Sequence, residues 1–282
     1  MMGDAPRPIA ARARLLLDRV RGFREALERS TAEPGDDTFL ATMDEFLGFV
    51  RASDDAMAWA EIERMGEVAA NRPFFAPRVL RFTWAMESRT HASLMKEFSS
   101  QKSPTSPGPL LRAQPWGAYA RMGETLDLCD FSGCRRAIMV GCGPVPDSLF
   151  CLHDQTAIPE LVGLDHDSAA LRMARELVCA CGFQDRIRIV GGDARAFDYA
   201  GFDLICCSVF AAPRGAVVER IAATAGPGAL VILREPSGPG TLLFESVLGA
   251  LPARFEPLAA SAAPRGRFML SYRVFRLGAI QE

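Results

Sequence analysis

The chain has 282 residues, of which 49% are hydrophobic and 23% charged, and its formal net charge is −2. This composition is ordinary for a globular protein, and the near-neutral charge excludes the basic surface typical of proteins that bind nucleic acids or anionic membranes. No run approaches the roughly 20 uncharged apolar residues of a membrane span, and the N-terminus lacks the apolar segment of a secretory signal. We therefore expect a cytoplasmic protein.

The N-terminal 99 residues carry apolar side chains at helical spacing. Asp36 and Asp37 stand where a side chain can cap the second helix. No alternating run suggests a strand in this part. We predict four helices that form a helical cap domain over residues 1–99. Their apolar stripes lie within residues 12–30, 39–50, 54–70 and 76–98.

A segment rich in Ser, Pro and Gly then interrupts the helical pattern. Residues 99–115 read SSQKSPTSPGPLLRAQP, a composition typical of a domain connection or loop. We predict a linker at residues 100–115, followed by a second domain at residues 116–282.

Strand and helix patterns alternate in the second domain, with helices predicted at about 116–129 and 168–181. The predicted strands lie at 137–140, 161–164, 187–190, 203–207, 229–233, 255–259 and 268–275. Apolar strands that alternate with helices predict a parallel sheet covered on both faces. The last two strands, joined by residues 262–266, predict an antiparallel hairpin at its edge. The predicted fold is α/β, a Rossmann-like doubly wound sheet of the class I methyltransferase type.

A glycine turn, Gly141-Cys142-Gly143-Pro144, follows the first predicted strand. Glycines there let the backbone approach a ligand at the start of a helix. Asp165 ends the second strand, where a carboxylate can accept both hydroxyls of an adenosine ribose, and Asp193 follows the third, where S-adenosylmethionine enzymes commonly place a carboxylate near the adenine amino group. A nicotinamide or flavin enzyme would more often show a third glycine at the usual spacing, whereas Val145 and Pro146 follow here. The turn therefore argues against those two cofactors.

These signals predict an S-adenosylmethionine site, with a fold that has lost its ligand as the alternative. His166 directly follows Asp165 and is expected near the ribose. The predicted contacts are Gly141, Cys142, Gly143, Pro144, Asp165, His166, Asp193, Ala194 and Ser208.

Eight cysteines lie in the C-terminal part of the chain, mostly within apolar segments and without paired C-x-x-C spacing. Such cysteines are usually small buried apolar residues. The three histidines do not accompany a cysteine pair at zinc-ligand spacing. We expect no metal.

Three passages resemble the nicotianamine synthase family and its bacterial metallophore-forming relatives. Residues 140–148 (VGCGPVPDS) resemble the family's V-G-S-G-P-L-P variant of the glycine turn. Residues 202–210 (FDLICCSVF) are similar to its Y-D-V-V-F-L-A-A-L. Residues 227–234 (PGALVILR) resemble its P-G-A-L-L-V-V-R and continue to Leu242-Leu243-Phe244. Ordinary methyltransferases usually have an acid and a glycine where Met139 and Val145 stand.

The match is thinner elsewhere in the chain. Trp84-Ala85-Met86-Glu87 corresponds to the family's E-x-E-type segment, and residues 115–119 (PWGAY) to its F-P-Y-Y-x-N-Y segment. The C-terminal strands show no H-P or V-I-N-S match, so the resemblance covers about two-thirds of the chain.

The resemblance implies attack of an amine on the γ-carbon of the 3-amino-3-carboxypropyl arm of S-adenosylmethionine, with release of methylthioadenosine. The product would be a nicotianamine-like metallophore precursor. Glu87 or Tyr119 would orient the amine and take its proton, and Arg234 would hold a substrate carboxylate in a bidentate fork. Each residue also has a simpler alternative. Glu87 would pair with Arg89 or Arg81 on a solvated helix face, Tyr119 would be a packed ring, and Arg234 would neutralise Glu235 or another acid at the edge of the core.

Other reactions and roles stay open. The cofactor's own α-amine could attack its γ-carbon and close azetidine-2-carboxylate, with Trp84, Phe82 or Trp116 near the sulfonium. A small-molecule methyltransferase is the second hypothesis. A non-catalytic adenosylmethionine-binding or partner-binding protein is the third, and it predicts that Glu87 and Tyr119 point away from the cofactor cleft. We expect a small-molecule substrate, with no nucleic-acid or membrane partner, and leave a homodimer open.

Overall fold

The computed structural model describes residues 8–31, 33, 35–98, 105–114, 118–261 and 270–279. Two compact units make up the chain. The first contains Met1–Ala85, Pro236–Ser246 and Ala263–Ser271, and the second contains Met86–Glu235, Val247–Ala262 and Tyr272–Glu282. The chain thus passes from the first unit to the second inside one long helix. The predicted domain boundary near residue 99 lies outside the described residues and stays a prediction.

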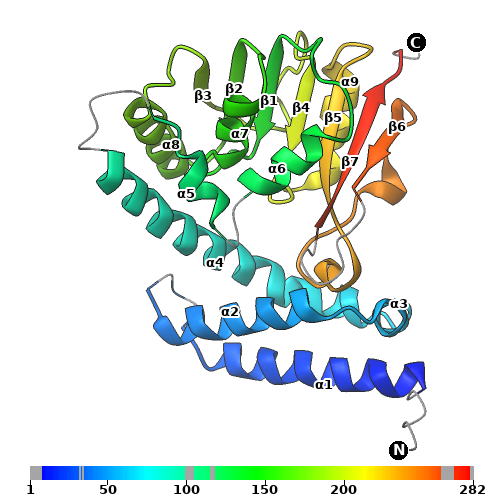
Figure 1. Cartoon of the computed structure of the whole chain (residues 1–282). Coiled ribbons are helices and arrows are strands. Elements are labelled where there is room, and N and C mark those ends of the chain that lie inside the picture. The colour runs from blue at the N-terminus through cyan, green and yellow to red at the C-terminus, as the bar shows by residue number, and fades with distance from the viewer. Residues whose placement is uncertain are drawn as a thin grey trace, which may run out of the picture. The chain divides into compact units, whose positions relative to one another are not determined.

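The first unit contains helices (Figure 1) that pack together through aromatic side chains. They are α1 (Ile9–Glu28), α2 (Asp37–Ala52), α3 (Ala56–Arg64), the first part of α4 (Glu67–Phe98), and the short 3-10 helix η1 (Gly238–Leu242). Asp36 caps α2 by accepting hydrogen bonds from Thr38 N and Phe39 N, as predicted. Phe46 and Phe75 stack in the core with ring centroids 4.3 Å apart.

The four predicted helices are present, but the predicted boundary between the third and fourth was wrong. The third was expected to run to about residue 70, whereas α3 ends at Arg64 and α4 begins at Glu67. Gly66 separates them because its φ of +77° is a left-handed conformation that interrupts a right-handed helix. Pro73 and Pro77 lie inside α4.

The second unit is built on a seven-stranded sheet of order β3-β2-β1-β4-β5-β7-β6. The strands are β1 (Arg136–Val140), β2 (Glu160–Asp165), β3 (Ile187–Gly191), β4 (Leu204–Cys207), β5 (Leu230–Pro236), β6 (Phe255–Ala260) and β7 (Leu270–Leu277). β1 to β5 pair in parallel, and β6 pairs antiparallel with β7 at the edge, with a register shift between Pro257 and Ala259. The predicted fold class is confirmed, and the connection at residues 262–266 lies outside the described residues.

Both faces of this sheet are apolar and covered. One face packs with Met122 of α6 (Tyr119–Leu126), Leu149 of α7 (Asp147–Gln155) and Leu171 of α8 (Ser168–Ala180). The other packs with Val217 and Ile221 of α9 (Arg214–Thr224). Within the predicted linker lies a short helix, α5 (Gly108–Arg112), which the Pro-rich composition did not indicate. The unit also contains the 3-10 helix η2 (Leu248–Ala250).

Six of the eight cysteines are buried, as expected, whereas Cys129 is half-buried and Cys179 exposed. In the described part of the chain, no three or more His, Cys, Asp or Glu side chains gather as metal ligands would. None of the described helices combines the length and apolar character that a membrane crossing requires.

Candidate cofactor site

The glycine turn lies at the carboxyl end of β1, between the ends of the neighbouring strands β2 and β4. Gly141 and Gly143 have φ values of +71° and +67°, which side-chain-bearing residues rarely adopt. Gly141 N donates to Leu164 O at 2.8 Å, and a Cβ built on Gly141 would lie 3.2 Å from Cβ of Ser208. The turn therefore needs glycine both for its conformation and for the close approach of β4.

Asp165, at the end of β2, lies at this turn. Its Oδ2 accepts a hydrogen bond from Gly143 N at 2.9 Å, and its Oδ1 accepts from the backbone N–H groups of His166 and Asp167 at 2.8 and 3.1 Å. These three donors fix the carboxylate, whose oxygens retain lone pairs for further hydrogen bonds. Asp167 itself caps α8 by accepting from two backbone N–H groups.

The remaining predicted cofactor contacts differ in exposure. Cys142 and Pro144 are buried, and burial raises the pKa of the Cys142 thiol. The His166 side chain is 86% exposed. Asp193 is exposed and pairs with Arg195 at 2.7 Å, and this hydrogen bond chiefly lowers its pKa to about 2.

Two of the predicted cofactor contacts, Ala194 after β3 and Ser208 after β4, make hydrogen bonds through their backbone groups. Ala194 O accepts from the Tyr199 hydroxyl at 2.9 Å. Ser208 N donates to Val140 O at 3.0 Å, which ties the end of β4 to the end of β1.

Glu87, from α4, faces the glycine turn rather than a solvated helix face. A Cβ built on Gly143 would lie only 2.9 Å from Oε2 of Glu87. Burial, and then the negative charges of Asp147 and Asp165, raise the pKa of Glu87 to about 8, while Arg234 acts in the opposite direction. The carboxyl group thus titrates near neutral pH and can exchange a proton there.

Arg234 is a buried cation on β5, 8% exposed. Its Nη2 donates a hydrogen bond to the Ser148 hydroxyl, and its guanidinium lies 5.7 Å from the centroid of the Tyr272 ring. Glu235, one of the acids that Arg234 was expected to neutralise in the simpler alternative, pairs with Arg214 at 2.5 Å.

Tyr119 is not brought together with Glu87. Its hydroxyl donates to Asp154 Oδ2 at 2.6 Å. Burial, and then this hydrogen bond, raise the pKa of Tyr119 to about 12. Asp154 lies near the C-terminal end of α7, whereas the glycine turn precedes its N-terminal end, roughly 10 Å away along the helix axis. The ring is packed, and its predicted catalytic role stays a prediction.

We expect Tyr119→Phe to destabilise the protein by about 1–3 kcal/mol, because Asp154 loses a buried donor while the ring is retained. Urea unfolding followed by circular dichroism would measure the change. A free energy of unfolding equal to that of the parent chain would contradict a structural role for the hydroxyl.

Two residues at the start of α7, Asp147 and Ser148, were missed as site residues. Asp147 accepts a hydrogen bond from Ala118 N, and Ser148 accepts one from Arg234. Their position directly after the glycine turn, at a helix N-terminus, was the available signal.

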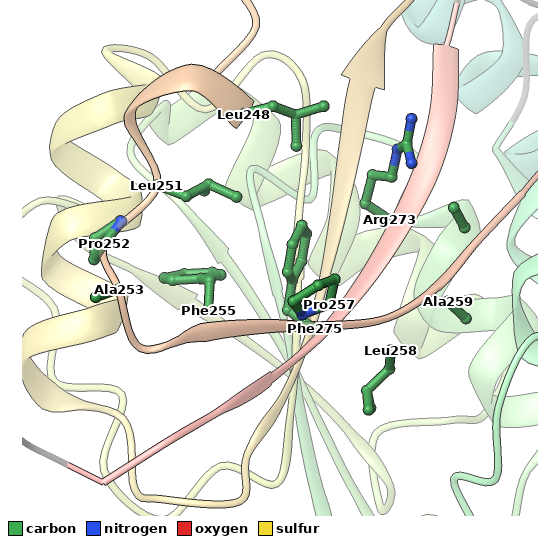
Figure 2. A pocket seen from close by; sticks show the side chains of 11 residues that line it. Leu248, Leu251, Pro252, Ala253, Phe255, Pro257, Leu258, Ala259, Arg273 and Phe275 are labelled. Atoms are coloured by element: carbon green, nitrogen blue, oxygen red, sulfur yellow. The ribbon is translucent and has the colours of Figure 1, made fainter.

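A groove in the second unit lies away from the predicted site residues. It has a volume of about 510 Å³ and lies between η2 and the β6–β7 hairpin, lined by apolar side chains and Arg273 (Figure 2). None of the predicted cofactor contacts lines it.

The strand order and the glycine turn define the second unit as a Rossmann-like domain of the class I methyltransferase type. The whole chain is similar to MtNAS, a nicotianamine synthase, which supports the family resemblance at the level of fold. A glutamate-to-glutamine variant of MtNAS matches 98% of this chain and all of its own, at 15% identity and a TM-score of 0.68. MtNAS in complex with MTA and tNA matches with the same coverage, at 16% identity and a TM-score of 0.70.

A third structure, the variant in complex with S-adenosylmethionine, covers 96% of each chain at 17% identity and a TM-score of 0.58. No protein-family model and no curated protein sequence matches the chain.

Proposed function

We propose that this chain is an S-adenosylmethionine-dependent enzyme that uses the 3-amino-3-carboxypropyl arm of the cofactor. The observation that carries the proposal is Glu87, a carboxyl group with a pKa of about 8 that lies against Gly143 of the glycine turn. The shared fold with MtNAS, which has been described with S-adenosylmethionine and with MTA (methylthioadenosine), supports it. The proposed contacts are those predicted from the sequence, with Asp165 on the ribose.

In the proposed reaction, a neutral amine attacks the γ-carbon of the arm in line with the carbon–sulfur bond. The new C–N bond forms as the C–S bond breaks, and the bonding electrons leave with sulfur in methylthioadenosine. The nitrogen becomes positively charged as the C–N bond forms, and Glu87, ionised beside the sulfonium, takes the proton that this nitrogen loses. Arg234 holds the carboxylate of the arm and keeps the γ-carbon in place. The reaction uses no metal.

Two sources of the amine fit this scheme. An external amine would give a nicotianamine-like metallophore precursor, whereas the cofactor's own α-amine would close azetidine-2-carboxylate. The test is mass spectrometry of purified protein with S-adenosylmethionine alone and then with histidine or other amines. We expect methylthioadenosine above a no-enzyme control, and its formation without added amine would favour cyclisation. S-adenosylhomocysteine with a methylated acceptor would overturn the proposal in favour of a methyltransferase.

A further inference from the structure

A buried ion pair lies behind Arg234. Arg214, the first residue of α9, and Glu235, on β5, are 3% and 1% exposed in their side chains. Nη2 of Arg214 donates to Oε1 of Glu235 at 2.5 Å and to the backbone O of Arg234 at 2.7 Å. One guanidinium thus holds both the residue after Arg234 and the carbonyl group of Arg234 itself.

The pair and the candidate site lie on opposite faces of the sheet. Successive side chains of a strand point to opposite faces, and β5 follows this rule. Leu230 and Ile232 pack on the face of α7, whereas Val231 and Leu233 pack on the face of α9. Arg234 continues the first series and contacts Ser148 of α7, and Glu235 continues the second and contacts α9. Anchoring Glu235 therefore fixes the strand while leaving the Arg234 side chain on the site face.

Glu235 also links the two ends of residues 236–246, a segment that leaves the second unit and returns to it. Its Oε2 accepts a hydrogen bond from Val247 N at 3.2 Å. Residues 236–246, between these two, belong to the first unit. The pair thus holds together the two points at which the chain leaves and re-enters the second unit, directly beside Arg234.

Stability alone is a weak reason for such a pair. Removing two charges from water costs about as much as their attraction returns, and well-packed apolar residues often replace a buried ion pair without loss. We propose that the Arg214–Glu235 pair is a positioning device, which aims the Arg234 guanidinium at the carboxylate of the amino-acid arm of S-adenosylmethionine. This inference rests on the proposed function.

The test compares two ligands by isothermal titration calorimetry. S-adenosylmethionine carries the amino-acid arm, whereas methylthioadenosine lacks the whole arm and therefore the carboxylate that Arg234 is proposed to hold. The variants are Glu235→Gln, which keeps an acceptor but removes the charge, and the double change Arg214→Met with Glu235→Leu, which replaces the pair by apolar side chains of similar length. Glu61→Gln, which removes the charge from the exposed pair with Arg64 in the same way, is the matched control. Thermal unfolding of each variant shows whether it is folded.

We expect the double variant to remain folded, with a Tm lowered by the loss of the hydrogen bonds to Arg234 O and Val247 N. It should bind S-adenosylmethionine about tenfold more weakly, with methylthioadenosine affinity unchanged. Glu235→Gln should show the same selective loss, and Glu61→Gln none. If the folded double variant binds S-adenosylmethionine as tightly as the parent chain does, or if both ligands weaken equally, the pair is merely structural and the inference is overturned. A parent chain that binds neither ligand would instead refute the proposed function.

Discussion

Replacing Glu87 by glutamine is expected to lower the rate of methylthioadenosine formation by roughly a hundredfold or more. Glutamine keeps the shape of the side chain but cannot take a proton, and a positioned general base contributes on the order of 10²–10⁴ in rate. Rates measured by mass spectrometry under saturating S-adenosylmethionine would show the loss as a fall in kcat.

The pH dependence separates a base from a residue that only packs. The parent enzyme should gain activity as the pH rises through about 8, the pKa of Glu87 in the ligand-free protein, and the residual activity of Glu87→Gln should lack that step. We expect this step in the pH dependence of kcat/KM, because that ratio reports the pKa values of the free enzyme. A variant with at least half of the parent rate would remove Glu87 from the mechanism.

The same substitution should stabilise the ligand-free protein. The pKa of Glu87 is raised from its ordinary value of 4.5 to about 8 on folding, so between these values the folded chain binds more protons than the unfolded chain. Its free energy of unfolding therefore falls as the pH rises across that window. Glutamine does not ionise, so the variant does not lose stability in this way as the pH rises. The Tm of Glu87→Gln should therefore exceed that of the parent chain by a margin that grows from pH 5 to pH 8.

The second large effect is expected at Gly143. Gly143→Ala places a Cβ 2.9 Å from Oε2 of Glu87, at a residue whose φ is +67°. The left-handed conformation costs a residue with a side chain about 1–2 kcal/mol, and the methyl group must displace the carboxylate. Because a misplacement of about 1 Å can cost on the order of a hundredfold in rate, we expect a loss of that size in methylthioadenosine formation together with a lower Tm.

Gly133→Ala is the matched control for this change. Gly133 lies in a turn before β1, has no positive φ, and a Cβ there would meet nothing within 4 Å. It should leave activity and Tm unchanged. If Gly143→Ala behaved like Gly133→Ala in both measurements, the close approach of Glu87 to the turn would be refuted.

Local sequence signals predicted the fold well and the site only in part. Apolar runs such as Leu161–Leu164 predict strands because burial on both faces of a sheet demands them, and β2 differs from that run by one residue at each end. Glycine spacing and a carboxylate at a strand end likewise singled out Gly143 and Asp165, which share a hydrogen bond in the structure. These features depend on residues close in sequence or on a repeating topology.

The partners of Tyr119 and Arg234 could not be predicted in this way. Tyr119 binds Asp154, 35 residues later, and Arg234 binds Ser148, 86 residues earlier. Which hydroxyl meets which carboxylate depends on how helices rotate against the sheet, and helical periodicity leaves that rotation undetermined. The pairing of Glu235 with Arg214 follows from strand alternation, but only once the start of α9 is known.

The edge strand β6 has a consequence for self-association. An exposed edge offers unpaired backbone groups to the edge of another copy. Pro257 has no N–H to offer, and the register shift between Pro257 and Ala259 interrupts the regular ladder in the middle of the strand. Two copies therefore cannot join their sheets into one continuous sheet through β6. A homodimer built on this edge would therefore need side-chain contacts in place of shared backbone hydrogen bonds, whereas the other edge of the sheet is β3.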